Sequence, residues 1–119
     1  MAEREPFHRS FGYSIQDSID GLLNELEIDA VGMWQIVPKG RVDFGLEGSE
    51  LADFVRRHVS ALVYAGALPQ MIKFCDGQKQ WVPDPKYGTD REGIIERVMN
   101  EWLADPIDPD VGGLWFQTP

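Results

Sequence analysis

The sequence predicts an α+β domain, a two-layer sandwich in which helices cover one face of an antiparallel sheet. Apolar residues recur at helical spacing in three segments, and β-favouring runs flank two tight turns. The 119 residues suffice for one core. With 43% hydrophobic residues, the chain has enough apolar surface to fold. We therefore expect a single domain over 1–119, with an N-terminal arm at 1–13 and a tail at 105–119 docked on it.

The segment from Ser14 to Leu26 predicts the first helix. Ser14 is followed three residues later by Asp17, a spacing that favours a capping box. The apolar residues of this segment fall on one helical face: Ile15, Ile19, Leu22, Leu23 and Leu26.

Two hairpins are predicted from β-favouring runs on either side of a turn. The first joins Val31–Val37 to Arg41–Phe44 through a Pro-Lys-Gly turn. The second joins Met71–Cys75 to Lys79–Val82 through Asp76-Gly77, a dipeptide that accepts positive φ.

Two further helices are predicted. One runs from near Ser49 to about Ala67 and is stopped by Pro69. Its second half is apolar nearly all round, so we expect it to lie deepest in the core. The other opens at Thr89, whose hydroxyl is spaced to form a capping box with Glu92, and it ends at Asp105-Pro106.

Leu114-Trp115-Phe116 predicts a short C-terminal strand, because bulky apolar residues near a chain end are stabilised by docking. The predicted order is αββαββα followed by this strand. That order resembles small protein-binding scaffolds, among them the acidic secretion chaperones, but element order alone does not fix function.

Charge excludes several classes of partner. The chain has 20 acidic and 11 basic side chains, a formal net charge of −9. Between Arg9 and Lys39, and again beyond Arg97, there are acids and no base. Such a field repels phosphate backbones and anionic lipid, so we expect neither duplex nucleic acid nor membranes as partners. The longest strongly apolar stretch, Val59 to Leu68, is about half the ~20 residues that a membrane span needs.

Cysteine content and the first residues indicate the compartment. Cys75 is the one cysteine, so no intramolecular disulfide is possible. The charged first residues lack the basic start and apolar stretch of a signal peptide. We expect a cytoplasmic protein.

Candidate catalytic and metal-binding groups are sparse. Cys75, His58 and His8 are the only residues for a Cys–His pair, and their spacing does not favour one. The acids Asp105, Asp108 and Asp110 lack the frame and closing glutamate of a calcium loop. We expect no catalytic residue, no cofactor and no metal.

Between Lys73 and Tyr87 lysines alternate with aromatic residues, a mixture typical of single-stranded nucleic-acid platforms. Because Asp76 and Asp84 reduce its net charge to +1, we interpret this stretch as a hairpin with one face in the core and lysines guarding an edge.

The leading functional hypothesis is a non-enzymatic interaction domain, a regulator, adaptor or chaperone-like protein. It binds a protein partner, for which the acidic regions favour a basic surface, or a second copy as a homodimer. The candidate partner-binding residues are Trp81, Tyr87, Trp115, Phe116, Asp17, Asp20 and Glu25. The alternative is a small-ligand-binding or catalytic domain with a pocket between sheet and helices, where His58 is the polar group and Trp34 or Trp81 an apolar wall.

Overall fold

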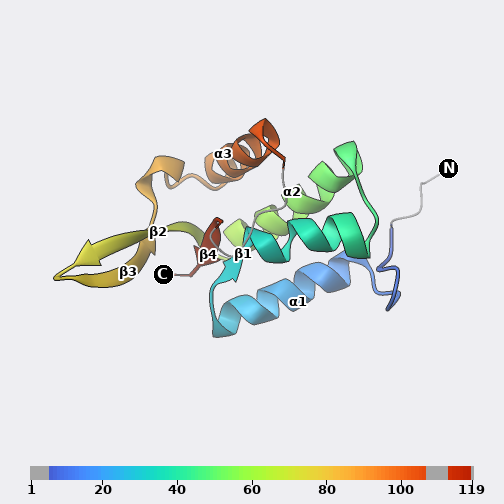
Figure 1. Ribbon diagram of the computed structural model, residues 1–119, viewed down its shortest axis with the longest axis horizontal. Coiled ribbons are helices and arrows are strands. Elements are labelled where there is room, and N and C mark those ends of the chain that lie inside the picture. Colours follow the sequence, from blue (N-terminus) through green and yellow to red (C-terminus); the bar gives the residue numbers. More distant parts are fainter. Residues whose placement is uncertain (1–5, 107–112, 119) are drawn as a thin grey trace.

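The computed structural model describes residues 6–106 and 113–118, and within them it is an α+β fold, as predicted (Figure 1). The α-helices are α1 (Ile15–Ile28), α2 (Gly48–Tyr64) and α3 (Arg91–Ala104). The strands are β1 (Val31–Gly32), β2 (Leu68–Cys75), β3 (Gln78–Pro83) and β4 (Trp115–Gln117), which form an antiparallel sheet in the order β1-β4-β2-β3.

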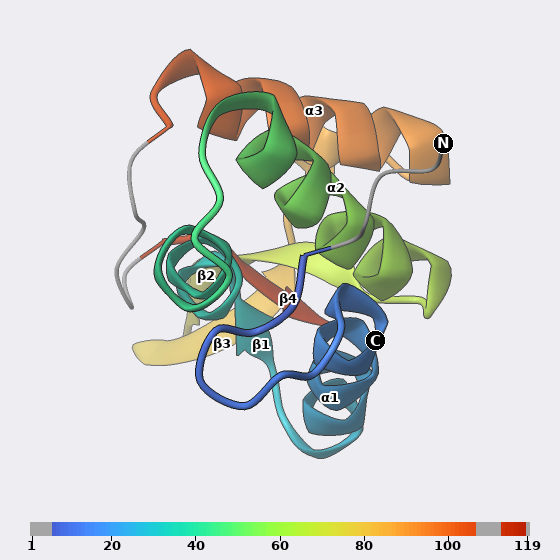
Figure 2. The same ribbon diagram turned by 90° about the vertical axis from the view of Figure 1, so that its right-hand side faces the viewer.

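The helices form one body in which α2 lies between α1 and α3 (Figure 2). Ser14 and Asp17 make the predicted capping box at the start of α1. The core takes side chains from all three helices and from the sheet, and its most enclosed large residues include Phe54, Phe116, Ile36, Leu62, Ile94, Ile95 and Met99.

The C-terminal strand is docked, as the apolar residues near the chain end predict. β4 lies between β1 and β2, with Phe116 opposite Val31 on one side and opposite Pro69 on the other. The Phe116 side chain is fully buried. The end of the chain therefore supplies a central strand rather than an accessory tail.

The predicted first hairpin is wrong. Only Val31–Gly32 are extended; a 3-10 turn, η1 (Met33–Gln35), and a π-helical turn, η2 (Lys39–Asp43), follow. Pro38 sits in this helical stretch with φ −63° and ψ −33°, not in a β-turn between strands. The buried residues recur at i, i+3, i+4, i+7 and i+11, a helical period that prevails over the β-propensity of the branched residues: Met33, Ile36, Val37, Gly40 and Phe44.

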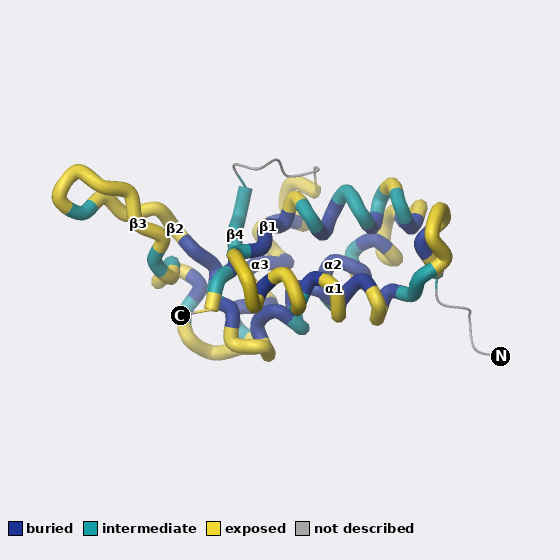
Figure 3. The backbone as a smooth tube through the Cα atoms, turned by 90° about the horizontal axis from the view of Figure 1, so that it is seen from below, coloured by how far each residue is buried: buried dark blue, intermediate teal, exposed yellow. Residues whose placement is uncertain are grey.

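The second hairpin forms as predicted but lies elsewhere than expected. Asp76 and Gly77 adopt φ values of 52° and 78°, which fit a tight primed turn. From Met71 onward both strands are largely exposed, and the hairpin extends away from the helices (Figure 3). The expectation of one face in the core is therefore wrong for this outer part, because no helix lies over it.

Helix ends shift by a few residues from their predicted positions. α3 begins one residue later than expected, because the Asp90 side chain rather than Thr89 accepts a hydrogen bond, from the Gly93 amide at 2.8 Å. α2 ends at Tyr64, and Gly66 follows with φ +98°. Tyr64 is exposed, so the second half of α2 is not enclosed all round.

A membrane-spanning helix is missing from the described part of the chain, where every helix is too short or too polar to cross a bilayer.

Candidate functional site

Three tryptophans lie in a row on the surface, where the hairpin meets the helical body. The Trp115 ring is in the middle, with its centroid 6.2 Å from that of Trp34 and 6.3 Å from that of Trp81. Trp34 is 39% exposed and Trp81 is 50% exposed. These separations and the interplanar angles of 61° and 59° are those of favourable aromatic pairs.

The alternation of side chains along β4 places Trp115 at the surface. Successive residues of a strand point to opposite faces of the sheet. Because Phe116 points into the core, its neighbour Trp115 points away from the core.

Gly32 is the residue that allows Trp34 to reach Trp115. It lies opposite Trp115 in the β1–β4 pair. A Cβ atom at position 32 would lie 2.5 Å from Cδ1 and 2.8 Å from Nε1 of Trp34. The missing side chain therefore leaves the space that the Trp34 indole fills.

The row continues along one face of the hairpin. Trp81 on β3 is directly opposite Ile72 on β2, and Lys79 is directly opposite Phe74. Directly opposed residues of an antiparallel pair share a face of the sheet. Both Ile72 and Phe74 are exposed. We call this continuous surface the tryptophan strip: Trp34, Trp115, Trp81, Ile72 and Phe74.

The other end of the strip is acidic. Trp34 and Trp115 line an open pocket of about 280 Å³ together with Ile28, Glu25 and Asp29. Ile28 is 87% exposed, and both carboxylates are exposed as well. Gln35 orients one of them, since its Nε2 donates to a Glu25 carboxylate oxygen at 2.6 Å.

Among the residues predicted from sequence, Trp81, Trp115 and Glu25 meet at this site. Tyr87 and Phe116 do not, because both side chains are buried. The Tyr87 hydroxyl donates to Glu101 at 2.5 Å, and burial together with this bond raises the pKa of Tyr87. These two residues stabilise the fold and present almost no surface to a partner.

Asp17 and Asp20 are exposed near the start of α1, away from the acidic end of the strip. The Asp17 carboxylate accepts from the Ser14 amide in the capping box. Asp20 accepts from the Gln16 side chain at 3.0 Å. Both contacts are local to the first turns of the helix.

His58 lies on α2, and its side chain is buried against α1. Its Nδ1 donates to the Phe54 carbonyl at 2.8 Å, so its Nε2 accepts from the Ser18 hydroxyl, also at 2.8 Å. Burial lowers the pKa of His58 to about 4. The ring is 1% exposed and both nitrogens are engaged, so His58 offers no polar atom to a ligand, while Trp34 lies outside on the strip.

Cys75 lies far along the hairpin, next to its turn, whereas both histidines are buried in the helical body. The described residues hold no group of three histidine, cysteine, aspartate or glutamate side chains arranged for a metal ion. Asp108 and Asp110 lie outside the described residues.

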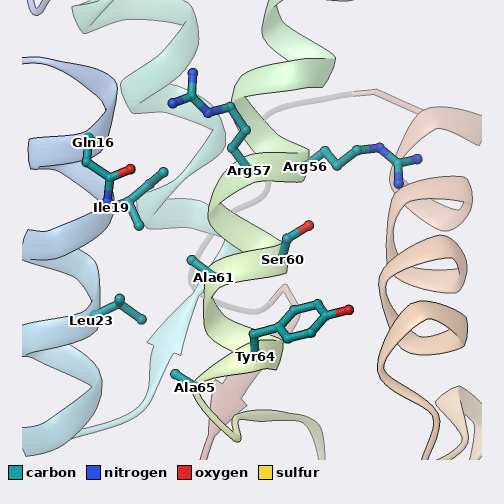
Figure 4. Close-up of a pocket in the computed structure, with 9 residues that line it drawn as sticks. All are labelled: Gln16, Ile19, Leu23, Arg56, Arg57, Ser60, Ala61, Tyr64 and Ala65. Atoms are coloured by element: carbon teal, nitrogen blue, oxygen red, sulfur yellow. The ribbon is translucent and has the colours of Figure 1, made fainter.

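A second surface feature is an open groove of about 630 Å³ along α2, which sequence reasoning missed (Figure 4). On one side, Tyr64 donates to Glu92 and Arg56 pairs with Glu96 at 2.5 Å, linking α2 to α3. The sequence signal for this groove is a set of small residues on α2, a helix whose second half was expected to lie in the core. The lining residues are Gln16, Ile19, Leu23, Arg56, Arg57, Ser60, Ala61, Tyr64 and Ala65.

Comparison of the chain with protein-family models, curated proteins and solved structures gave no match.

Proposed function

We propose that this chain is a non-enzymatic, cytoplasmic protein-interaction domain, a regulator or adaptor, that binds a partner protein through the tryptophan strip. The observation that carries the proposal is the row of three tryptophans in which Trp115 contacts both Trp34 and Trp81, and both of these are exposed. Contiguous exposed apolar surface is rare on monomers and common at binding sites, and tryptophan is enriched among the residues that dominate binding energy.

The strip is favourable for binding because its centre is held in place before a partner arrives. Trp115 belongs to β4, which is hydrogen-bonded to a strand on either side. A preorganised surface loses little conformational freedom on binding. Covering the exposed half of one indole stabilises a complex by about 2–3 kcal/mol, from about 100 Å² of apolar area.

The experiment compares two aromatic side chains of equal exposure. Trp81 is 50% exposed on the strip, and Tyr64 is 52% exposed on the groove along α2. Wild type, Trp81→Ala and Tyr64→Ala serve as bait for proteins from the source cells, and each captured protein is purified and titrated against all three. Circular dichroism verifies that both variants fold.

We expect a purified partner to bind wild type and Tyr64→Ala alike, and to bind Trp81→Ala about tenfold or more weakly, as for an interface hot spot. Equal binding by all three chains would overturn the strip as the binding surface.

A further inference from the structure

We infer that the partner of the tryptophan strip is a second copy of this chain, packed face to face about a two-fold axis through Trp115. The inference rests on the proposed function and names its partner. It comes from the order of side chains along the strip and from the charges at its two ends.

A tryptophan flanks Trp115 on either side of the strip. Toward the hairpin, the Trp81 ring lies 6.3 Å from that of Trp115, and exposed Ile72 is the cross-strand partner of Trp81. The other direction leads to a tryptophan at 6.2 Å and then to exposed Ile28 in the adjoining pocket. A two-fold axis through Trp115 superposes the strip on its own reverse, so Trp34 of each copy would face Trp81 of the other.

The two ends carry opposite charge. At the hairpin end Lys79 is exposed, and among the described residues it makes no ion pair. At the body end stand the exposed carboxylates of Glu25 and Asp29. Rotation about the central axis brings the lysine of each copy onto the carboxylates of the other, which makes the surface self-complementary in charge as well as in shape.

The hairpin also lacks support within its own chain. Its outer part is exposed, and the molecule measures 56 Å along its longest axis against 28 and 23 Å along the others. A two-stranded hairpin without packing on a third element is marginally stable in water. In the proposed dimer each hairpin packs on the body of the other copy.

The net charge of −9 opposes self-association as a whole. Salt of about 0.15 M screens charges beyond about 8 Å, which weakens this repulsion more than it weakens close contacts at the strip. Association is therefore measured by sedimentation velocity in 0.15 M NaCl, over chain concentrations from about 1 to about 200 µM.

The variants reverse one charge at a time and then both. Lys79→Glu places like charges at both ends and should raise the dimer dissociation constant about tenfold. Glu25→Lys offsets the charge of Asp29 and should also raise the dissociation constant, but by less. The double variant places an acid at the hairpin end and a base beside Asp29 at the body end, so its dissociation constant should fall from that of Lys79→Glu toward that of wild type.

The matched controls change net charge by the same amount outside the strip. Lys73 lies opposite Gln80 on the other face of the same hairpin, so Lys73→Glu has the net charge of Lys79→Glu. Glu27 is exposed on α1 and does not line the pocket with Trp34, so Glu27→Lys matches Glu25→Lys. Both controls should self-associate within about twofold of wild type.

A dimer that the double variant restores and the controls leave unchanged supports the inference. Two results would overturn this arrangement. One is a dimer dissociation constant that Lys73→Glu raises as much as Lys79→Glu does, and the other is a dissociation constant that the double variant does not restore. A monomer at every concentration overturns the second copy as partner. In that case the proposed function still stands if a different protein binds wild type but not Trp81→Ala. If wild type and Trp81→Ala capture that protein equally, the proposed function is overturned as well.

Discussion

Ser18 Oγ lies 2.8 Å from His58 Nε2, a buried hydrogen bond that joins α1 to α2. Burial keeps the ring neutral, and because Nδ1 donates to the Phe54 carbonyl, the serine hydroxyl is the donor to Nε2. A proton added to Nε2 would remove the acceptor and place a charge in the core. The two helices that form one side of the body are therefore joined by a contact that requires neutral histidine.

This contact predicts a specific dependence of stability on pH. The pKa of His58 falls from 6.5 in the unfolded chain to about 4 in the folded protein, because burial disfavours the charged ring. Between these values the unfolded chain binds the proton and the folded protein does not. The stabilisation is therefore complete above pH 6.5 and is lost as pH falls toward 4, by about 3 kcal/mol.

The measurement is urea unfolding at several pH values between 4 and 7 for wild type and His58→Gln. Carboxylates titrate in both chains, so the difference between the two slopes isolates the histidine. Wild type should lose stability more steeply than His58→Gln over this range. Parallel curves would show that the ring takes up its proton as readily in the folded protein as in the unfolded chain.

Gly32→Ala is expected to displace Trp34 while the fold is retained. The new methyl group would meet the Trp34 indole at 2.5 Å, and the backbone at this position, with φ −115°, is open to alanine. The near-ultraviolet circular dichroism from the contact of Trp34 with Trp115 should decrease, and binding through the strip should weaken. Gly21→Ala is the control, because a Cβ there meets nothing within 4 Å. An unchanged aromatic spectrum would contradict the assigned role of Gly32.

The two tyrosine–carboxylate bonds differ in burial, which predicts unequal effects on stability. Tyr87 is buried and donates to Glu101, whereas Tyr64 is 52% exposed and donates to Glu92. Tyr87→Phe should lower the free energy of unfolding by about 1–2 kcal/mol, and Tyr64→Phe should lower it clearly less, because water replaces the exposed bond. Urea unfolding of both variants provides the measurement, and equal losses would contradict the prediction.

Local rules predicted the elements whose signals lie within a few residues. Ser14 and Asp17 form the expected capping box, and Asp76-Gly77 forms the expected turn. Each feature depends on side chains or φ values within one turn of the chain. The start of α3 was placed one residue early because Thr89 and Asp90 are both good N-caps, and only the hydrogen bond to Gly93 distinguishes them.

The features that local rules did not predict depend on tertiary packing. Ile36 and Val37 favour a strand by propensity, but both are fully buried at helical spacing against the core. Nothing within the hairpin sequence indicates that it extends beyond the helices. The contact of Trp34 with Trp115 joins residues 81 positions apart through Gly32, and no periodicity in the sequence reveals it. The sequence therefore pointed to Trp81 and Trp115 as binding residues but treated Trp34 as the wall of an internal pocket.

Adjacent residues of β4 are expected to separate stability from binding. Phe116 is fully buried, so Phe116→Ala should lower the free energy of unfolding by about 3–5 kcal/mol. Trp115 is partly exposed on the opposite face of the same strand, so Trp115→Ala should cost clearly less stability and yet abolish association through the strip. Urea unfolding and sedimentation velocity of both variants measure the two effects. If Trp115→Ala destabilised the fold as much as Phe116→Ala, Trp115 would be a core residue and the centre of the strip would have no separate role in binding.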